Sequence, residues 1–403
     1  MHVGVFLSNL KPTWGGGFTF EDEVREGLIE HHRKSSHRFS FIGLAPAAQQ
    51  PCPIPFISIY PPLFDRLRFK AHCYTQRLWQ GSRFHGPFDQ LQPRTVWRQL
   101  KPHHIDIIWG LSPGMPIFDC PMITTVWDLQ HRRQPFFPEV SHFGIWEWRE
   151  AYFRRALQRA VGIITPNAVG QAEIEQFYGV PSERIWPMPH PTPRFALMES
   201  QQPAKPDALA RFKLPKPFLF YPAQFWPHKN HVTVLHAVKL LQEKHGLTFH
   251  MVFTGSDHGN QTHVRQTAER LGIRDRVFFL GFVERSELIA LYREAFALLY
   301  LTLFGPENLP PLEAFALGCP VVASRVAGAD EQLGEAARLV DALDASQAAQ
   351  AIADLHQQPN QRAQLIERGR QRASAYTISH FLQDVFARLD DFARIGACWL
   401  PPS

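Results

Sequence analysis

Short apolar runs alternate along the chain with stretches whose apolar positions recur at helical spacing. Runs of the first kind predict buried strands, and stretches of the second kind predict amphipathic helices. In the first half, strands are expected at 2–10, 39–44, 105–110, 122–127 and 161–165, with a long helix at 145–159. This alternation favours a parallel sheet that helices cover.

The same alternation starts again in the second half. Strands are expected at 218–223, 249–253, 277–280 and 297–304, and helices at 230–245, 263–271 and 286–294. The sequence therefore predicts two doubly wound α/β domains, with a ligand in a cleft where their strand ends meet. A proline-rich stretch between the two series is the best linker candidate. The expected parts are a first domain at 1–195, a linker at 196–215, a second domain at 216–378, and a final helix and tail at 379–403 that pack back toward the first domain.

One segment of the second series, FGPENLPPLEAFALGCPVVAS (304–324), predicts a loop, a helix and a strand with well-marked boundaries. Asn308 is a favourable N-cap, prolines occupy the first helical turn, and Gly318 stands where a left-handed C-terminal cap belongs. The free amides and the dipole of such a helix start attract an anion. Glu313, one turn into the helix, is expected to face the same ligand.

A second glycine-rich turn follows the first strand. Three glycines at 15–17 precede an amphipathic helix, and a turn of this kind is compatible with a phosphate. The turn lacks the GxGxxG spacing, and no acidic residue closes a following strand at the distance that a nicotinamide dinucleotide requires. A dehydrogenase is therefore disfavoured.

Length and composition narrow the class of protein. The chain has 403 residues, 45% of them hydrophobic and 20% charged, which suits a globular protein of two domains. Five scattered cysteines without CxxC spacing argue against a disulfide framework and a zinc site, so a reducing cytosol is expected. The first strand begins at residue 2, and no apolar run reaches the roughly 20 residues of a membrane span, so we expect neither signal peptide nor span.

The charge balance is basic. A net charge of +5 and a pI of about 9.0 suggest an acidic partner, and a nucleotide, an anionic lipid or simple solvation of the surface all fit. The sequence shows no paired zinc ligands and no RNP signature, so a nucleic-acid partner is not expected.

Four segments of the second half occur in the order and approximate spacing of one enzyme family. They are YPAQFWPHKNHVTVLHAVKLL, FTGSD, VFFLGFVERSELIALYREA and NLPPLEAFALGCPVVAS. With these segments the chain resembles the retaining nucleotide-sugar glycosyltransferases of family 4, whose GT-B fold has two Rossmann-like domains facing across a cleft. The glycine turn and DLQHRRQPFFPE (128–139) add to the likeness in the first half. The resemblance implies that the second domain binds a nucleoside-diphosphate sugar and that the first binds the acceptor.

The resemblance also implies which residues bind the donor. Lys229 and the backbone amides of Asn308 and Leu309 match the groups that neutralise the diphosphate leaving group without a metal ion. Glu313 matches a glutamate that binds the ribose hydroxyls. The expected donor-binding set further includes Phe282 and Val283 beside the base, together with Gly16, Gly17, Gln224, His228 and Gly255. No cofactor is expected besides the donor, which would be of the GDP or UDP type.

The chain departs from the family pattern at three positions. Gly305 stands where a glutamate holds the donor sugar, Gln224 where an arginine contacts the diphosphate, and Trp127 where a histidine contacts the transferred sugar. His228 could supply part of the lost positive charge. These replacements lie inside otherwise intact segments, which suggests a subfamily variant.

Three residues are candidates for catalytic roles. Asp128 follows a predicted strand, so it could position or deprotonate the acceptor hydroxyl. His131 and Glu307 lie close in sequence to the two missing sugar-binding side chains and are candidates to replace them. In retaining enzymes of this kind the departing phosphate is thought to assist the proton transfer, so no protein nucleophile is nominated.

These expectations combine into one predicted function. The chain would move a hexose, with mannose slightly preferred, from a nucleoside-diphosphate sugar to a saccharide or lipid-linked saccharide during assembly of cell-surface polysaccharide or glycolipid. Basic and aromatic residues mix at Leu63–Gln80 and Trp146–Arg159, so a helix there could rest on an anionic bilayer, or pack on its own domain. The expected location is the cytoplasm, with peripheral contact to the cytoplasmic face of the inner membrane.

Two other functions remain open at this point. Another GT-B enzyme, such as a nucleotide-sugar epimerase or a phosphorylase, would share the fold. A nucleotide-sugar-binding scaffold without transfer activity is compatible with Gly305 and Trp127. Turnover of the donor distinguishes an enzyme from a scaffold.

Overall fold

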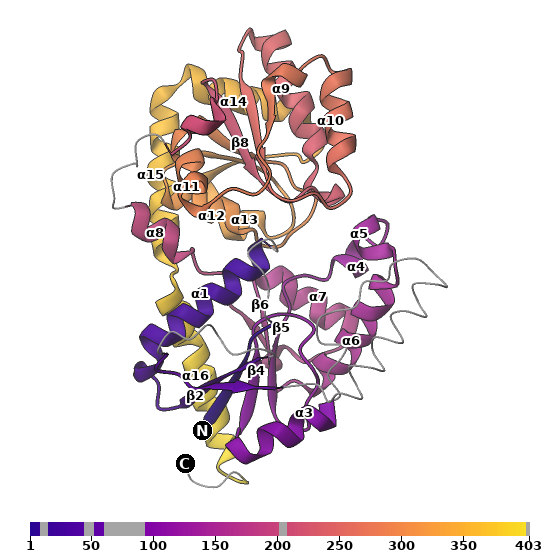
Figure 1. Cartoon of the computed structure of the whole chain (residues 1–403), viewed down its shortest axis with the longest axis vertical. Helices are drawn as coiled ribbons and strands as arrows, with labels where there is room; N and C mark the ends of the chain where they lie inside the picture. Colours follow the sequence, from indigo (N-terminus) through magenta and orange to yellow (C-terminus); the bar gives the residue numbers. More distant parts are fainter. Residues whose placement is uncertain (9–14, 44–51, 60–92, 201–207, 400–403) are drawn as a thin grey trace. The chain divides into compact units, whose positions relative to one another are not determined.

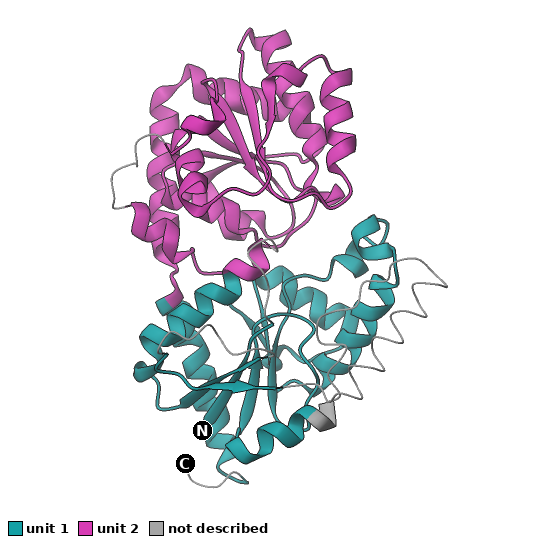
Figure 2. Ribbon diagram, viewed as in Figure 1, with its two compact units in different colours: residues 1–11, 20–189, 379–403 teal, residues 12–19, 190–378 magenta. Residues whose placement is uncertain are grey.

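The computed structural model describes residues 1–8, 15–43, 52–59, 93–200 and 208–399 of the chain. These residues form two compact α/β units (Figure 1, Figure 2). As far as the chain is described, unit 1 comprises residues 1–11, 20–189 and 379–403, and unit 2 comprises residues 12–19 and 190–378. The C-terminal segment therefore belongs to the same unit as the first strand.

Unit 1 is built on a parallel sheet with the strand order β3-β2-β1-β4-β5-β6-β7. Its strands are β1 (His2–Phe6), β2 (Arg38–Gly43), β3 (Phe56–Ser58), β4 (Ile107–Gly110), β5 (Met122–Thr125), β6 (Gly162–Thr165) and β7 (Ile185–Pro187). Val5 in the central strand lies beside Phe41 of β2 and Trp109 of β4. Strands β1, β4, β5 and β6 are buried throughout, as expected for a parallel sheet covered on both faces.

The helices of unit 1 pack on this sheet and on one another. They are α1 (Gly16–His31), α3 (Pro93–Leu100), α4 (Gln130–Arg133), α5 (Pro138–Ser141), α6 (Ile145–Arg159), α7 (Ala168–Tyr178) and α16 (Ile378–Gly396). Helix α6 contacts α4, α5 and α7. Phe381 of α16 meets Phe20 of α1 edge-on and stacks with Trp109 of β4. The last helix thus completes the core of unit 1.

Unit 2 has a second parallel sheet with the strand order β10-β9-β8-β11-β12-β13. Its strands are β8 (Phe218–Pro222), β9 (His250–Thr254), β10 (Val277–Phe279), β11 (Ala297–Tyr300), β12 (Val321–Ser324) and β13 (Ala337–Val340). Leu219 of β8 lies between Met251 of β9 and Ala297 of β11, and all three side chains are fully buried.

The helices of unit 2 form two packed groups. They are α8 (Arg194–Ser200), α9 (His231–His245), α10 (Gln261–Arg270), α11 (Arg285–Glu294), α12 (Leu309–Ala316), α13 (Ala329–Leu333), α14 (Ala345–Gln357) and α15 (Pro359–Ala375). Helix α9 packs against α10 and α14, whereas α12 packs against α8, α11 and α15. The core therefore joins residues from the whole second half of the chain.

The structure confirms the predicted fold class, two doubly wound parallel-sheet domains of Rossmann type. Three strands that the sequence did not predict, β3, β7 and β13, lie at sheet edges and have only three or four residues. β3 and β7 stand among prolines, which argue against a strand in the sequence but are tolerated at a sheet edge.

Part of the expected linker is helical in the structure, because α8 buries Ala196 completely in the core of unit 2. The basic and aromatic stretch Leu63–Gln80 lies outside the described residues. Among the helices that the structure describes, none combines the length and the apolar character of a membrane span.

Candidate functional site

A cavity of about 180 Å³ lies in unit 2 beside the carboxyl ends of β8 and β9, with the first turns of α1 and α12 in its wall. Its lining residues are Gly15, Gly16, Thr19, Pro222, Ala223, Gln224, Thr254, Gly255, Ser256, Phe282, Val283, Leu288, Leu309, Pro310 and Glu313. Sheets of this kind bind ligands at this edge, where the loops after the strands converge. The cavity brings together the predicted donor residues Gly16, Gln224, Gly255, Phe282, Val283, Leu309 and Glu313.

Gly255 allows two loops to touch at the cavity. Its φ is +124°, and a Cβ atom there would lie 2.5 Å from the carbonyl oxygen of Ala223. Any side chain would therefore separate the loop after β9 from the loop after β8. The Gly255 N–H donates to the carbonyl oxygen of Gly281 at 2.8 Å, which also fixes the loop after β10.

Glu313 presents a buried carboxyl group at the cavity wall. Its Oε2 accepts a 2.6 Å hydrogen bond from the Tyr292 hydroxyl of α11, and the residue is 7% exposed. Burial raises the pKa of Glu313 to about 7, although the Tyr292 hydrogen bond and the charge of Arg285 act in the opposite direction. A hydrogen-bonding ligand at this wall would meet a carboxyl group that titrates near neutral pH.

Lys229 ends a 3₁₀ turn, Pro227–Lys229, that precedes α9. Its Nζ donates to the Tyr300 hydroxyl at 3.1 Å and to Asn308 Oδ1 at 3.3 Å. The next residue, Asn230, has a left-handed φ of 56° and donates through its side chain to the Leu301 carbonyl oxygen at 2.9 Å. The turn is thereby fastened to the end of β11, and the ammonium group is held at the start of α12.

Asn308 occupies the N-cap position of α12, as predicted, but its side chain makes no capping hydrogen bond. The Oδ1 atom instead accepts from Lys229 and, at 3.0 Å, from the Tyr300 hydroxyl. The amide Nδ2 donates to the Gly305 carbonyl oxygen at 3.1 Å. The side chain thus holds the lysine and the preceding loop. The backbone N–H of Asn308, one of the two amides predicted at the diphosphate, donates to Gln332 Oε1 at 3.0 Å.

Gly305 cannot be replaced by a glutamate without rearrangement. Its φ is +130°, and a Cβ atom would lie 2.7 Å from Asn308 Nδ2. Glu307 is turned to another partner: its Oε2 accepts from the backbone N–H of His190 at 2.6 Å, and its side chain is 3% exposed. Glu307 is not among the residues that line the cavity, and its predicted role at the donor sugar stays a prediction.

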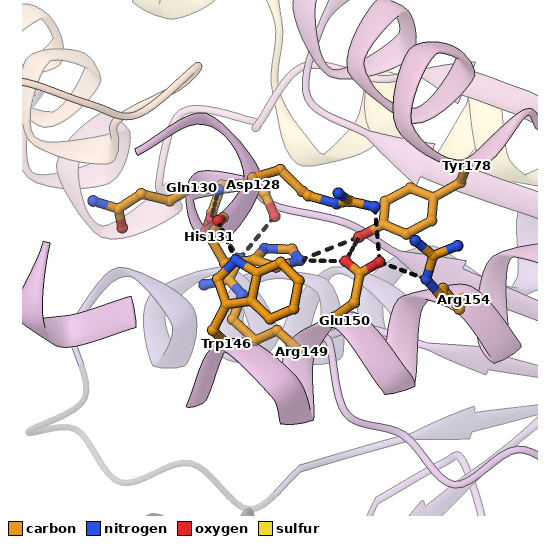
Figure 3. Close-up of polar contacts among 9 residues, drawn as sticks. Asp128, Gln130, His131, Trp146, Arg149, Glu150, Arg154 and Tyr178 are labelled. Carbon is orange, nitrogen blue, oxygen red and sulfur yellow. Dashed lines mark hydrogen bonds and ion pairs between the residues drawn. The ribbon is translucent and has the colours of Figure 1, made fainter. Parts of the chain in front are cut away.

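Asp128 lies in unit 1, just after β5, and is held by α6 (Figure 3). Arg149 Nη2 donates to its Oδ1 at 2.6 Å, and the Gln130 N–H donates to the same oxygen at 2.9 Å. Burial alone would raise the pKa of Asp128, but the charge of Arg149 and these hydrogen bonds outweigh it and lower the pKa below its usual range. The carboxylate is therefore a good hydrogen-bond acceptor and a weak base.

His131, three residues after Asp128 in the sequence, is completely buried, and its ring lies beside Glu150 and Tyr178 (Figure 3). Its Nε2 is 3.1 Å from the Tyr178 hydroxyl and 3.4 Å from Glu150 Oε2, and its ring stacks on Phe153. Burial and the charge of Arg149 lower the pKa of His131 to about 4, against the influence of Asp128 and Glu150. A neutral, enclosed imidazole supports the loop, and its predicted contact with the sugar stays a prediction.

Other predicted residues lie near the cavity without lining it. Gly17 is in the first turn of α1, and the His228 carbonyl oxygen accepts from the Leu303 N–H at 2.7 Å. Two tyrosines of the site were not predicted from the sequence. Tyr292 donates to Glu313, and Tyr300 accepts from Lys229. A hydroxyl-bearing aromatic at the end of a buried apolar run was the available signal. Within the described residues, no three His, Cys, Asp or Glu side chains are grouped as metal ligands.

Comparison with known proteins assigns a family likeness to unit 2. Residues 207–372 match the family Glycosyl transferases group 1. The chain is 24% identical over 226 residues to the serotype-specific mannosyltransferase WbdA of Escherichia coli, which is 55% of this chain and 28% of WbdA. It is 27% identical over 234 residues to the O-antigen chain mannosyltransferase RfbU of Salmonella typhimurium, which is 57% of this chain and 60% of RfbU. The match thus spans less than two thirds of either relative.

A solved structure extends the likeness to the whole fold. Sucrose-phosphate synthase from Thermosynechococcus elongatus is similar over 98% of this chain and 100% of that chain, with a TM-score of 0.72 and 18% identity. A likeness at this identity concerns the fold alone. The chain therefore has the GT-B pair of Rossmann-like domains, as its sequence predicted.

Proposed function

We propose that the protein is a retaining, metal-independent glycosyltransferase that moves a hexose, of mannose type, from a nucleoside-diphosphate sugar to a saccharide or lipid-linked saccharide. The acceptor would belong to a cell-surface polysaccharide or glycolipid, in keeping with the similarity to the O-antigen chain mannosyltransferase RfbU and the serotype-specific mannosyltransferase WbdA. The donor would be of the GDP or UDP type.

One observation carries this proposal: a carboxyl group in the cavity wall and a lysine outside that wall both lie at the start of helix α12. Glu313 lines the cavity, and Lys229 is held on Asn308, the residue before Leu309 in the cavity wall. The carboxyl group suits paired ribose hydroxyls, and the lysine and helix amides suit a diphosphate. Apart from Gly15, Gly16 and Thr19, the residues that line the cavity lie within the region similar to Glycosyl transferases group 1.

The proposed reaction breaks the bond between the sugar C1 and the phosphate oxygen and joins C1 to the acceptor oxygen on the same face. Lys229 and the α12 amides would stabilise the charge that develops on the departing diphosphate. The acceptor proton would pass to that phosphate, because Asp128, with its lowered pKa, is a poor base. Asp128 would instead accept a hydrogen bond from the acceptor and orient it.

The test combines binding and turnover. Thermal-shift and calorimetric titrations with GDP, UDP, GDP-mannose, UDP-glucose and UDP-N-acetylglucosamine should show saturable binding of one nucleotide series, because a ligand of the native state raises the melting temperature. The bound donor should then be hydrolysed slowly, or transferred to an oligosaccharide acceptor with its anomeric configuration retained. Binding of no nucleotide would refute the donor site, and an inverted product would refute retention.

A nucleotide-sugar-binding scaffold is the second candidate, and Gly305 is the observation that favours it. The backbone at this position leaves no room for the carboxylate that holds the donor sugar in the resembling family. A scaffold would bind the nucleotide sugar saturably and give neither hydrolysis nor transfer with any acceptor. Product formation decides between the two candidates.

The membrane contact expected from the sequence also stays part of the proposal. The protein should co-sediment with anionic vesicles at low salt, and it should not co-sediment with neutral vesicles. Failure to bind the anionic vesicles would remove the peripheral location and leave the donor site untouched.

A further inference from the structure

Four side chains close a ring of contacts behind the cavity wall. Trp226 Nε1 donates to Gln224 Oε1 at 2.9 Å, and Gln224 Nε2 lies 3.4 Å from Ser256 Oγ. Ser256 Oγ in turn lies 3.3 Å from His258 Nε2. The ring is completed by the Trp226 and His258 side chains, which stack with centroids 3.9 Å apart and planes 16° from parallel. Gln224 and Ser256 line the cavity, and Trp226 and His258 do not.

The tryptophan decides which end of the Gln224 amide it holds. An indole N–H can only donate, so the atom that it meets must be the amide oxygen. The amide nitrogen therefore occupies the other side of the group, 3.4 Å from Ser256 Oγ, and both residues line the cavity. A phosphate or hydroxyl oxygen that enters the cavity would meet N–H donors at Gln224.

The backbone fixes the place of this ring. The Phe225 N–H donates to the Ser256 carbonyl oxygen at 3.0 Å, so the loops after β8 and β9 are joined between the two pairs of side chains. The Trp226 N–H also donates to the Gln224 carbonyl oxygen at 2.8 Å, which folds the tryptophan back over the glutamine. The stacked rings thus rest on a rigid base, and Trp226 can orient Gln224 without touching a ligand itself.

Gln224 also faces the glycine turn at the start of α1. A Cβ atom built on Gly15 would lie 3.7 Å from both the amide carbon and Nε2 of Gln224. The two glycines Gly15 and Gly16 keep this space open, and both line the cavity. The amide of Gln224 therefore lies beside the start of α1, and the start of α12 lines the same cavity. Both helix starts favour an anionic ligand.

We propose that Trp226 is a positioning residue that holds the Gln224 amide with its N–H groups toward the cavity, where Gln224 donates to a phosphate oxygen of the nucleoside-diphosphate donor. This inference rests on the proposed function of the cavity. In the resembling family this position carries an arginine. Here Gln224 would be a neutral hydrogen-bond donor whose direction Trp226 fixes. Lys229 would then neutralise the charge of the diphosphate, and Gln224 would orient it.

The experiment is a double-mutant cycle read out by calorimetric affinity. The variants are Gln224→Met, Trp226→Phe and the double variant, and the probes are UDP and GDP beside uridine and guanosine. Gln224→Met should weaken binding of the accepted diphosphate about tenfold, and Trp226→Phe about three- to tenfold. The double variant should bind no more weakly than Gln224→Met, because Trp226 acts only through the glutamine.

Two comparisons separate positioning from a general structural effect. The affinity for the nucleoside should change little in every variant, because the nucleoside lacks the phosphates that Gln224 contacts. Trp148→Phe is the matched control, since Trp148 stacks on Tyr152 in unit 1, and this change should leave nucleotide affinity unaltered. Gln224→Glu keeps the acceptor for Trp226 but turns an oxygen toward the cavity, so it should abolish diphosphate binding even if Trp226→Phe does not fold.

The outcomes distinguish this inference from the proposed function. Wild-type protein that binds neither diphosphate would overturn the donor site and this inference with it. Wild-type binding combined with full affinity in Trp226→Phe or Gln224→Glu would overturn the inference alone. An equal loss for nucleoside and diphosphate, or losses that add in the double variant, would also overturn it, because Trp226 would then act on the cavity as a whole.

Discussion

The two units each carry one carboxyl group at the end of a parallel sheet, and the two groups have opposite electrostatic surroundings. Asp128 in unit 1 is paired with Arg149, and its pKa lies below the usual range. Glu313 in unit 2 is hydrogen-bonded to the neutral Tyr292, and its pKa is raised to about 7. Burial favours the neutral acid in both places, and only in unit 1 does a cation outweigh it.

This difference suggests that the two carboxyl groups have different roles. A permanently ionised carboxylate such as Asp128 can orient a hydroxyl group over a wide pH range. Glu313, with a pKa of about 7, is partly protonated near neutral pH. A ligand that donates hydrogen bonds to its oxygens would favour the ionised form, so ligand binding and proton release should be linked. Under the proposed function, a carboxyl group would therefore have a fixed role in unit 1 and a ligand-dependent role in unit 2.

The largest expected effect concerns the proton on Glu313. Its folded pKa of about 7 lies above the ordinary value of 4.5, so its contribution to stability is full below pH 4.5 and is lost as the pH rises toward 7. Glu313→Gln removes this titration while keeping an acceptor for Tyr292. The variant should gain about 3 kcal/mol in free energy of unfolding over wild type between pH 4.5 and pH 7.5.

Urea unfolding at pH 5, 6, 7 and 8 measures this difference. Glu335→Gln is the control, because Glu335 is an exposed residue and its replacement should give parallel curves. A constant offset between Glu313→Gln and wild type would show that Glu313 keeps an ordinary pKa, and the contrast with Asp128 would disappear.

Lys229→Ala should produce the next largest effect, on binding. A charge-assisted contact to phosphate contributes about 1.5–3 kcal/mol, so the affinity for the accepted nucleoside diphosphate should fall roughly 10- to 150-fold. Lys239→Ala is the control, since Lys239 pairs with Glu243 on α9 and should not contribute. Equal affinities of Lys229→Ala and wild type would place the phosphates elsewhere in unit 2.

Arg149→Met should have a smaller effect, on the stability of unit 1. The lowered pKa of Asp128 means that its ion pair stabilises the fold above the ordinary pKa of 3.8 and that this contribution is lost as the pH falls through the lowered value. We expect a loss of about 1–2 kcal/mol at pH 7 in chemical unfolding, and the difference from wild type should shrink as the pH falls below the lowered pKa. Arg394→Met breaks an exposed pair with Asp391 and should change stability by less than about 0.5 kcal/mol.

Glu307→Gln should have the smallest effect. Burial raises the pKa of Glu307 well above its usual range, although the His190 N–H acts against it. Glutamine offers the same N–H a neutral acceptor, and stability and donor-sugar selectivity should stay within about 0.5 kcal/mol of wild type. A changed preference among donor sugars would instead return Glu307 to the sugar-holding role expected from the sequence.

Much of the site was predictable because its signals are local. The glycines of the first turn, the lysine before α9 and the helix start at Leu309 all stand in short segments whose chemistry can be recognised without knowing what packs against them. Asn308 shows the limit of such signals. Its N-cap position was predicted correctly, but its side chain serves Lys229 and Tyr300, which are distant in sequence.

His131 shows the same limit in unit 1. The sequence places it three residues after Asp128, which makes it a candidate to contact the sugar. In the structure Phe153 of α6 and Tyr178 of α7 enclose the ring completely. No pattern near residue 131 reports that enclosure, because the covering side chains come from later helices.

The sequence alone determined the alternation of strands and helices and the ends of α12, since apolar periodicity, prolines and a left-handed glycine act within a few residues of one another. The tertiary structure decided the protonation of Asp128 and Glu313 and the direction of the Gln224 amide. The two carboxyl groups depend on partners from other helices, Arg149 and Tyr292. Trp226 is only two residues from Gln224, but it stacks on His258 of the loop after β9. Electrostatic and hydrogen-bonding environments arise only when such partners are brought within a few ångströms by the fold.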